Sequence, residues 1–240
     1  MTQSWLERTE LLLGEEKLDR LNRTHVLVVG LGGVGAYAAE MLARAGIGRL
    51  TIADSDTVSP GNINRQLVAL HSTVGEPKAE VLAGRLKDIN PTLDLTVVDS
   101  YIQEDTLEKL LDAAPYDYVV DAIDTLSPKV FFIYEALKRG FSLVSSMGAG
   151  GRIDPTKVEI ADIGQTHSCP LAKKVRVRLH RRDIHTGFKA VFSPESIQPS
   201  AMAACNELNK KTIVGTISYM PAIFGCTCAS VVIRDLIGTD

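Results

Sequence analysis

The sequence predicts an α/β protein built on a Rossmann-like, doubly wound and mostly parallel sheet. Two observations support this fold class. Short apolar runs alternate with longer amphipathic segments through the first 150 residues, and a glycine-rich turn at residues 30–35 directly follows the first apolar run. A strand, a tight glycine turn and a helix in this order are typical of a nucleotide-binding βαβ unit.

The helices are expected where leucines and charges recur at helical spacing, and breaker residues mark their ends. Pro91 ends one helix and Gly140 closes another, because neither residue type continues a regular helix. The expected helices cover residues 5–21, 36–45, 78–89, 106–114 and 128–139.

The strands are expected where short runs of β-branched and aliphatic residues lie between those helices. Such continuous apolar runs are typical of parallel strands that are buried on both faces. The expected strands cover residues 25–29, 50–53, 95–98, 116–120 and 142–145, with one more at 158–161.

Past residue 151 the alternation stops, and the sequence predicts an extension of the same domain. A basic stretch at 171–182 is followed by a polar segment, expected to be a loop, at 192–211. The nearly uncharged run 217–233 contains Pro221 and falls short of the roughly 20 apolar residues that span a bilayer. It therefore favours a buried closing helix, or one in a dimer interface, over a membrane-associated helix. We expect one domain over 1–240, with a nucleotide-binding core at 1–165 and a substrate-side extension at 166–240.

Composition excludes several protein classes. Hydrophobic residues make up 45% of the chain and charged residues 23%, which excludes a disordered protein. Four cysteines among 240 residues do not form a disulfide framework. The first 20 residues lack the apolar core of a signal peptide. We therefore expect a protein of the reducing cytoplasm.

The net charge of −3 hides a basic segment. Six cations without an intervening acid fall within ten residues: Lys173, Lys174, Arg176, Arg178, Arg181 and Arg182. Like-charged blocks of this density are typical of nucleic-acid or phosphate-binding patches, although a solvated helix face has the same pattern. The residues alone leave these two interpretations equally open.

The glycine turn predicts a phosphate site. In such a turn Gly30 permits a tight bend, Gly32 lets backbone N–H groups approach phosphate, and Gly35 lets the helix pack close to the strand. Asp54 ends the second predicted strand, where an acid accepts hydrogen bonds from ribose hydroxyls. NAD and ATP fit these features equally well.

The next segment favours ATP, because it adds cations that hydride transfer does not need. Asn62, Arg65 and Lys78 follow Asp54 on loops at the carboxyl edge of the sheet, and Asp124 follows the fourth strand at that edge. Arginine pairs bidentately with phosphate, and a carboxylate with phosphate oxygens holds Mg²⁺. Taken singly, Lys78 is also consistent with a solvated first-turn residue and Asp124 with a helix N-cap.

At these residues the chain resembles the ubiquitin-activating-enzyme-like (ThiF/MoeB-type) adenylyltransferases. The resemblance covers nearly all of 1–165 and implies that ATP adenylates a carboxylate. It implies that Asp54 binds the ribose, that Asn62, Arg65 and Lys78 hold the phosphates, and that Asp124 is the Mg²⁺ ligand. It further implies a homodimer in which Arg8 acts in the partner's site. The full set of expected ATP contacts is Gly30, Gly32, Gly33, Gly35, Asp54, Asp56, Gly61, Asn62, Arg65, Gln66, Lys78 and Asp124.

Two further features resemble one branch of this family, the tRNA threonylcarbamoyladenosine dehydratases. The chain lacks the paired Cys-x-x-Cys motifs of members that hold zinc, since its cysteines are Cys169, Cys205, Cys226 and Cys228. It also carries the run 148–155 and the basic stretch after Pro170. The resemblance implies ATP-dependent cyclisation of threonylcarbamoyladenosine in tRNA, no zinc, and contact between the basic stretch and the anticodon arm.

Other interpretations stay open at this point. The chain fits an adenylyltransferase for the C-terminus of a ubiquitin-like sulfur-carrier protein, and the sequence leaves open whether a sulfur-transfer or cysteine-desulfurase protein docks. It also fits a non-catalytic or NAD-binding Rossmann scaffold, in which Arg65, Lys78 and Asp124 would be incidental. Cys169 is expected to be an ordinary loop residue, since a reactive cysteine needs an activating environment.

Overall fold

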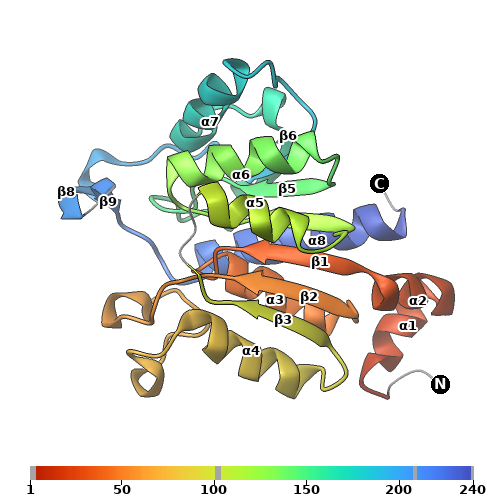
Figure 1. Ribbon diagram of the computed structural model, residues 1–240. Helices are drawn as coiled ribbons and strands as arrows, with labels where there is room; N and C mark the ends of the chain where they lie inside the picture. Colours follow the sequence, from red (N-terminus) through yellow and green to blue (C-terminus); the bar gives the residue numbers. More distant parts are fainter. Residues whose placement is uncertain (1–3, 101–103, 208–209, 239–240) are drawn as a thin grey trace.

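The computed structural model describes residues 4–100, 104–207 and 210–238 (Figure 1). Its main sheet has seven strands in the order β3-β2-β1-β4-β5-β7-β6, in which only the β6–β7 pair is antiparallel. The strands are β1 (His25–Val29), β2 (Arg49–Ala53), β3 (Asp94–Val98), β4 (Tyr118–Asp121), β5 (Leu143–Ser146), β6 (Glu159–Asp162) and β7 (Lys189–Phe192). This sheet confirms the doubly wound α/β fold.

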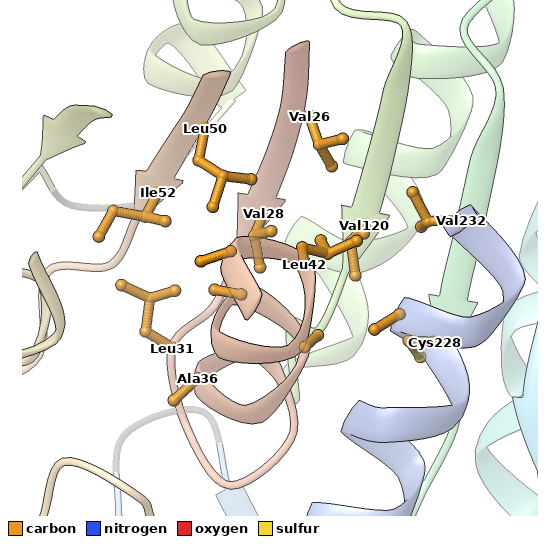
Figure 2. Close-up of a cluster of buried hydrophobic side chains, with 14 of the residues drawn as sticks. Val26, Val28, Leu31, Ala36, Leu42, Leu50, Ile52, Val120, Cys228 and Val232 are labelled. Atoms are coloured by element: carbon orange, nitrogen blue, oxygen red, sulfur yellow. The ribbon is translucent and has the colours of Figure 1, made fainter. Parts of the chain in front are cut away.

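The helices lie on both faces of the sheet, and each face has its own apolar core. On one face pack α3 (Gly35–Arg44), α4 (Lys78–Ile89) and α8 (Tyr219–Ile237), and on the other pack α5 (Glu104–Asp112), α6 (Leu126–Lys138) and α7 (Pro170–His180). In Figure 2, side chains of the central strands such as Val28, Ile52 and Val120 meet α3 and α8. Each such fully buried aliphatic side chain contributes about 1.5–3 kcal/mol to stability.

The strand order reverses between β1 and β4, and this reversal positions the site. Val29 pairs in register with Ala53 on one side and with Asp121 on the other. The three strands therefore end at the same level, and the loops that follow them share the carboxyl edge of the sheet. In open α/β sheets, ligands bind at this crevice.

The predicted leading helix is wrong as a single element. It is two helices, α1 (Glu7–Leu13) and α2 (Glu15–Arg23), separated by Gly14 with a φ of 85°. Only glycine adopts such a left-handed conformation readily. Both helices precede β1 and therefore lie at the amino ends of the strands, opposite the glycine turn (Figure 1).

The predicted polar loop over 192–211 is also wrong. It contains the end of β7 and the first part of a two-stranded hairpin, β8 (Met202–Glu207) with β9 (Lys210–Val214), which stands away from the main sheet (Figure 1). Met202 and Ile213 in this hairpin are about half exposed, at 46% and 49%. Since the hairpin is not buried in a core, its sequence lacks the apolar alternation that predicts strands.

The closing helix α8 is confirmed as a packed element. It begins at Tyr219, two residues after the start of the apolar run. Among the described residues, α8 is the single helix whose length and apolar composition would allow it to span a membrane. Half of its most apolar window is nevertheless buried inside the protein. Met220, Phe224, Cys228 and Val232 follow one another at i, i+4 on its buried face. This face packs against α3 and β5, which explains the apolar composition without a membrane.

Candidate active site

The glycine turn after β1 is packed so tightly that most of its glycines admit no side chain. A Cβ on Gly35 would lie 1.8 Å from the Gly30 carbonyl oxygen, and one on Gly33 would lie 2.9 Å from Pro221 Cβ. Gly32 differs, because its nearest neighbour would be Gln66 Nε2 at 3.6 Å. Among the described residues no side chain caps the α3 N-terminus. The turn therefore leaves backbone N–H groups available to an anion at Gly32.

Asp54 ties the end of β2 to this turn. Its Oδ2 accepts a 2.5 Å hydrogen bond from the Leu31 N–H, and its Oδ1 accepts one of 2.8 Å from the Asp56 N–H. Burial raises the pKa of the Asp54 carboxyl, and these two N–H donors oppose the rise. Asp54 is thus held with a fixed orientation beside the turn. Its remaining lone pairs can accept hydrogen bonds from ribose hydroxyls.

The segment that carries Asn62 and Arg65 is ordered by its own side chains. Asn62 Oδ1 accepts a hydrogen bond from the Ser59 N–H at 3.1 Å. Arg65 Nη1 donates to the Gly61 carbonyl at 2.7 Å and to Asn64 Oδ1 at 2.9 Å. Gly61 therefore acts here through its carbonyl oxygen.

Gln66 extends this segment toward the glycine turn. Its Oε1 is buried and has no hydrogen-bond partner among the described residues, and its Nε2 lies beside Gly32. The segment after β2 and the turn after β1 are thus neighbours at the carboxyl edge.

Lys78 begins α4 and is only 4% exposed, so the interpretation of a solvated first-turn residue is wrong. Its Nζ lies 2.8 Å from Asp56 Oδ2, while the Asp56 side chain is 70% exposed. A buried ammonium beside one solvent-facing carboxylate retains capacity to attract phosphate. Asp56 is thereby placed as the partner of Lys78.

The structure adds a buried ion pair that the sequence analysis missed. Lys129 Nζ lies 2.7 Å from Asp121 Oδ2, and both side chains are fully buried. Asp121 also accepts hydrogen bonds from Ser145 Oγ at 2.6 Å and from the Ile123 N–H at 3.0 Å, and Lys129 donates to the Ile123 carbonyl at 3.1 Å. A lysine next to Pro128 in an otherwise apolar helix start was the available signal.

This ion pair orients the loop after β4. The loop passes so close to the glycine turn that a Cβ on Gly30, whose φ is 88°, would lie 2.7 Å from the Ala122 carbonyl oxygen. Asp121 is buried, and Asp124 is exposed at the end of the loop. The N-cap position of α6 is Thr125, so the interpretation of Asp124 as the cap is wrong.

Arg8 is not brought to this edge. It lies exposed on α1, at the opposite edge of the sheet (Figure 1). Within one chain it therefore does not join Arg65 and Lys78.

The basic stretch forms α7 and the turn after it, packed on α6. Arg176 donates to Thr166 Oγ1, Arg178 Nη1 donates to Ser127 Oγ at 2.7 Å, and the Arg182 guanidinium lies 4.8 Å from the Tyr134 ring centre. Lys173 and Lys174 are exposed. A hollow of about 400 Å³ is lined by Ser127, Val130, Phe131, Arg178, Arg181 and Arg182. Since Ser127 lies in the first turn of α6, this basic surface continues from the loop that carries Asp124.

The cysteines lie in or beside three elements: Cys169 is the N-cap residue of α7, Cys205 is in β8, and Cys226 and Cys228 are in α8. Cys169 is 3% exposed at the start of α7, and burial raises the pKa of the Cys228 thiol in α8 to about 12, so that thiol stays protonated. No group of three or more His, Cys, Asp or Glu side chains that could hold a metal occurs within the described residues.

The chain is similar in sequence to known proteins. The sequence pattern of the ThiF family matches residues 6–240. The tRNA threonylcarbamoyladenosine dehydratase of Bacillus subtilis is 46% identical over 189 residues, covering 79% of this chain and 74% of the relative. The sulfur carrier protein adenylyltransferase of Thermus thermophilus is 32% identical, covering 94% of this chain and 74% of the relative.

A solved structure extends the likeness to the whole fold. The Escherichia coli tRNA threonylcarbamoyladenosine dehydratase in complex with ATP superimposes with a TM-score of 0.87 at 36% identity, covering 99% of this chain and 96% of the other. Because it covers 99% of this chain, that likeness includes the glycine turn, the segment that carries Asn62 and Arg65, and the extension that carries α7 and α8. By the family pattern and by these relatives, this chain belongs to the ThiF family.

Proposed function

We propose that this chain is an ATP-dependent tRNA threonylcarbamoyladenosine dehydratase. It activates the threonine carboxylate of the modified adenosine and closes that group into a ring, with net loss of water. The likeness of 99% of the chain to the ATP-bound Escherichia coli dehydratase carries this proposal, because it spans the extension as well as the nucleotide core. The cations around the glycine turn supply the chemistry.

The residues divide the work of adenylation. The turn and the α3 N-terminus hold phosphate, Asp54 binds the ribose, and Asn62, Arg65 and Lys78 neutralise the phosphate charge. A carboxylate oxygen attacks the α-phosphorus, and pyrophosphate leaves with the electron pair of the broken P–O bond. Preorganised cations stabilise the charge that develops in this step, and no side-chain nucleophile is needed.

Ring closure follows on the acyl-adenylate. A nitrogen of the carbamoyl group attacks the activated acyl carbon, AMP leaves, and the nitrogen loses its proton. The elements of water leave in the combined products, AMP and pyrophosphate. Because the nitrogen and the acyl group belong to the same substituent, proximity accounts for most of this step.

Asp124 fits a Mg²⁺ ion that arrives with ATP. Mg²⁺ takes one or two carboxylates together with phosphates and waters, and it neutralises charge on the triphosphate. The Asp124 carboxylate is exposed at the end of the loop after β4, at the carboxyl edge where the triphosphate would lie.

We further propose that the enzyme is a cytoplasmic homodimer in which Arg8 reaches the partner's site. Arg8 lies far from its own glycine turn, so a role in catalysis requires a second copy. Leu11 and Leu12 on the same helix are 81% and 82% exposed, which suits an interface. Cations of α7 and its following turn contact the phosphates of the anticodon arm without reading sequence.

Activation of a sulfur-carrier protein is the second candidate. The Thermus thermophilus likeness favours it, because that relative is a sulfur carrier protein adenylyltransferase. Adenylation is common to both candidates, and they differ in whether the carboxylate belongs to RNA or to a protein. A sulfur-transfer partner belongs to this second candidate. The NAD-binding scaffold is disfavoured, since it gives the buried Lys78 no role.

Nucleoside mass spectrometry tests the proposal. The purified protein is incubated with ATP, Mg²⁺ and tRNA that carries linear threonylcarbamoyladenosine, and the tRNA is then digested. We expect ATP-dependent loss of one water from that nucleoside, and none with Arg65→Ala. Unchanged nucleoside, despite measured ATP binding, would overturn the proposal and favour a protein carboxylate.

A further inference from the structure

Arg152 is a buried guanidinium whose bonding is incomplete. It follows β5 at the carboxyl edge and is 1% exposed. Its Nη1 donates to the Glu195 carbonyl at 2.6 Å, whereas its Nε and Nη2 have no hydrogen-bond partner among the described residues. A buried charge without a carboxylate partner is costly, so the position demands an explanation.

The backbone on both sides of Arg152 is fixed by long-range hydrogen bonds. The Gly151 N–H donates to the Gly215 carbonyl at 2.8 Å, and the N–H groups of Ile153 and Asp154 donate to the Glu195 carboxylate at about 3.1 and 3.0 Å. Tyr219 Oη donates to the Ile153 carbonyl at 2.8 Å. The side chain is therefore directed by a rigid frame and is not a loosely packed surface arginine.

The unpaired atoms lie on one edge of the guanidinium. The N–H groups of Nε and Nη2 are parallel and spaced to match the two oxygens of a carboxylate, the bidentate arrangement that distinguishes arginine from lysine. Nη1, which cannot complete that pairing with Nε, is the nitrogen already used. Arg152 thus keeps free the edge that recognises an oxyanion.

A short series of contacts connects the segment that carries Arg152 to the segment that carries Arg65. Arg65 donates to Asn64 Oδ1, and Asn64 Nδ2 donates to the Thr216 carbonyl at 2.9 Å. Thr216 Oγ1 would lie 3.2 Å from a Cβ on Gly150, two residues before Arg152. The segment with Arg65 and the segment with Arg152 are therefore neighbours at the carboxyl edge.

We propose that the Nε and Nη2 edge of Arg152 binds the threonine carboxylate of the modified adenosine and orients it for adenylation. This inference rests on the proposed function and assigns a substrate-binding residue to the same site. A tRNA phosphate offers similar oxygens, but it is flanked by sugars on both sides. A carboxylate at the tip of a side group reaches a buried edge more readily.

Binding to matched RNAs tests the assignment in the full-length protein. The probes are anticodon stem–loops that carry threonylcarbamoyladenosine or its threonine-amide analogue, measured with a non-hydrolysable ATP analogue present. A charge-assisted hydrogen-bond pair contributes about 1.5–3 kcal/mol, so wild type should prefer the carboxylate RNA about 10- to 100-fold. Arg152→Gln should abolish that preference, and Arg152→Lys, which keeps the charge without the fork, should retain part of it.

Thermal unfolding separates recognition from a structural role. Arg152→Gln should unfold at a temperature no lower than wild type, because it removes an unpaired buried charge. Arg152→Lys provides a second folded variant if the glutamine variant does not fold. An undiminished preference in Arg152→Gln would overturn the assignment. Equal weakening of both RNAs would assign Arg152 to a phosphate instead and overturn it as well.

The outcomes also distinguish this inference from the proposed function. If wild type removes water from the tRNA nucleoside and Arg152→Gln does so with the same kcat/KM, only the Arg152 assignment fails. If wild type neither removes water nor prefers the carboxylate RNA, the proposed function fails too. ATP binding, measured separately, should be equal in both proteins.

Discussion

The cations at the carboxyl edge and those on α7 lie in opposite environments. Lys78 and Lys129 are buried and held 2.8 and 2.7 Å from carboxylate oxygens. Lys173, Lys174 and Arg181 are exposed on or beside a helix. Buried pairs depend on fixed geometry and are little screened by salt, whereas exposed cations act over a distance that salt shortens. The first region suits a chemical step and the second suits capture of a polyanion.

This difference separates rate from affinity. Changes at the carboxyl edge should alter stability or kcat and be nearly independent of ionic strength. Changes on α7 should alter KM for tRNA, and they should alter how strongly tRNA binding depends on the salt concentration. The following predictions test that separation, from the largest expected effect to the smallest.

Loss of the Lys129 ammonium should have the largest effect. Lys129→Met leaves the Asp121 carboxylate buried without its partner and should lower the free energy of unfolding by about 3–5 kcal/mol. Urea denaturation measures this change. Lys138→Met, on the exposed side of the same helix, is the matched control and should stay within about 0.5 kcal/mol of wild type. Similar stabilities for the two variants would contradict a structural role for the pair.

Arg65→Ala should slow the enzyme without unfolding it. Removing one preorganised cation should lower kcat by about 10²–10³-fold, because the developing phosphate charge loses its partner. The partly exposed site predicts an unchanged melting temperature. Single-turnover assays on modified tRNA measure the rate, with Arg23→Ala at the opposite edge of the sheet as control. A loss confined to KM would show that Arg65 binds ground state and transition state alike.

Arg8→Ala should reduce activity by about 10²-fold if Arg8 acts in the partner's site. Mixed dimers distinguish this from a local effect. Equal mixing of Arg8→Ala and Arg65→Ala subunits builds one complete site per heterodimer, so about a quarter of the wild-type sites should return. Mixing either variant with itself should restore nothing. Failure of the mixture to recover, with subunit exchange verified, would contradict an Arg8 contribution across the dimer.

Neutralising the exposed lysines on α7 should have the smallest effect at low salt. Each lost phosphate contact should reduce the slope of log K for tRNA against log salt by about 0.7–0.9. We expect Lys173→Ala with Lys174→Ala to raise KM, to flatten that slope and to leave kcat unchanged. Lys109→Ala with Lys138→Ala removes equal charge elsewhere. Identical slopes for the two double variants would assign α7 to a solvated face.

Local patterns were sufficient for the nucleotide core. The apolar runs and the glycine turn specify parallel strands, and their carboxyl ends meet at one edge wherever the fold is doubly wound. That rule alone predicts that Asp54, Arg65, Lys78 and Asp124 lie at one edge of the sheet. The same reasoning failed at Gly14 and in the β8–β9 hairpin. At Gly14 the break depends on the backbone conformation of one residue, and the hairpin has half-exposed residues. Neither feature gives a periodic pattern in the sequence.

The sequence by itself therefore determined the fold class, the position of the glycine turn and the basic stretch, because each depends on residues near one another in the chain. Tertiary structure alone decided which cations are buried. Asp121 in β4 meets Lys129 from α6 and Ser145 from β5, and Arg152 meets the Glu195 carbonyl 43 residues away. Burial and pairing depend on such distant contacts, and it is burial that turns an ordinary lysine or arginine into a fixed electrostatic element.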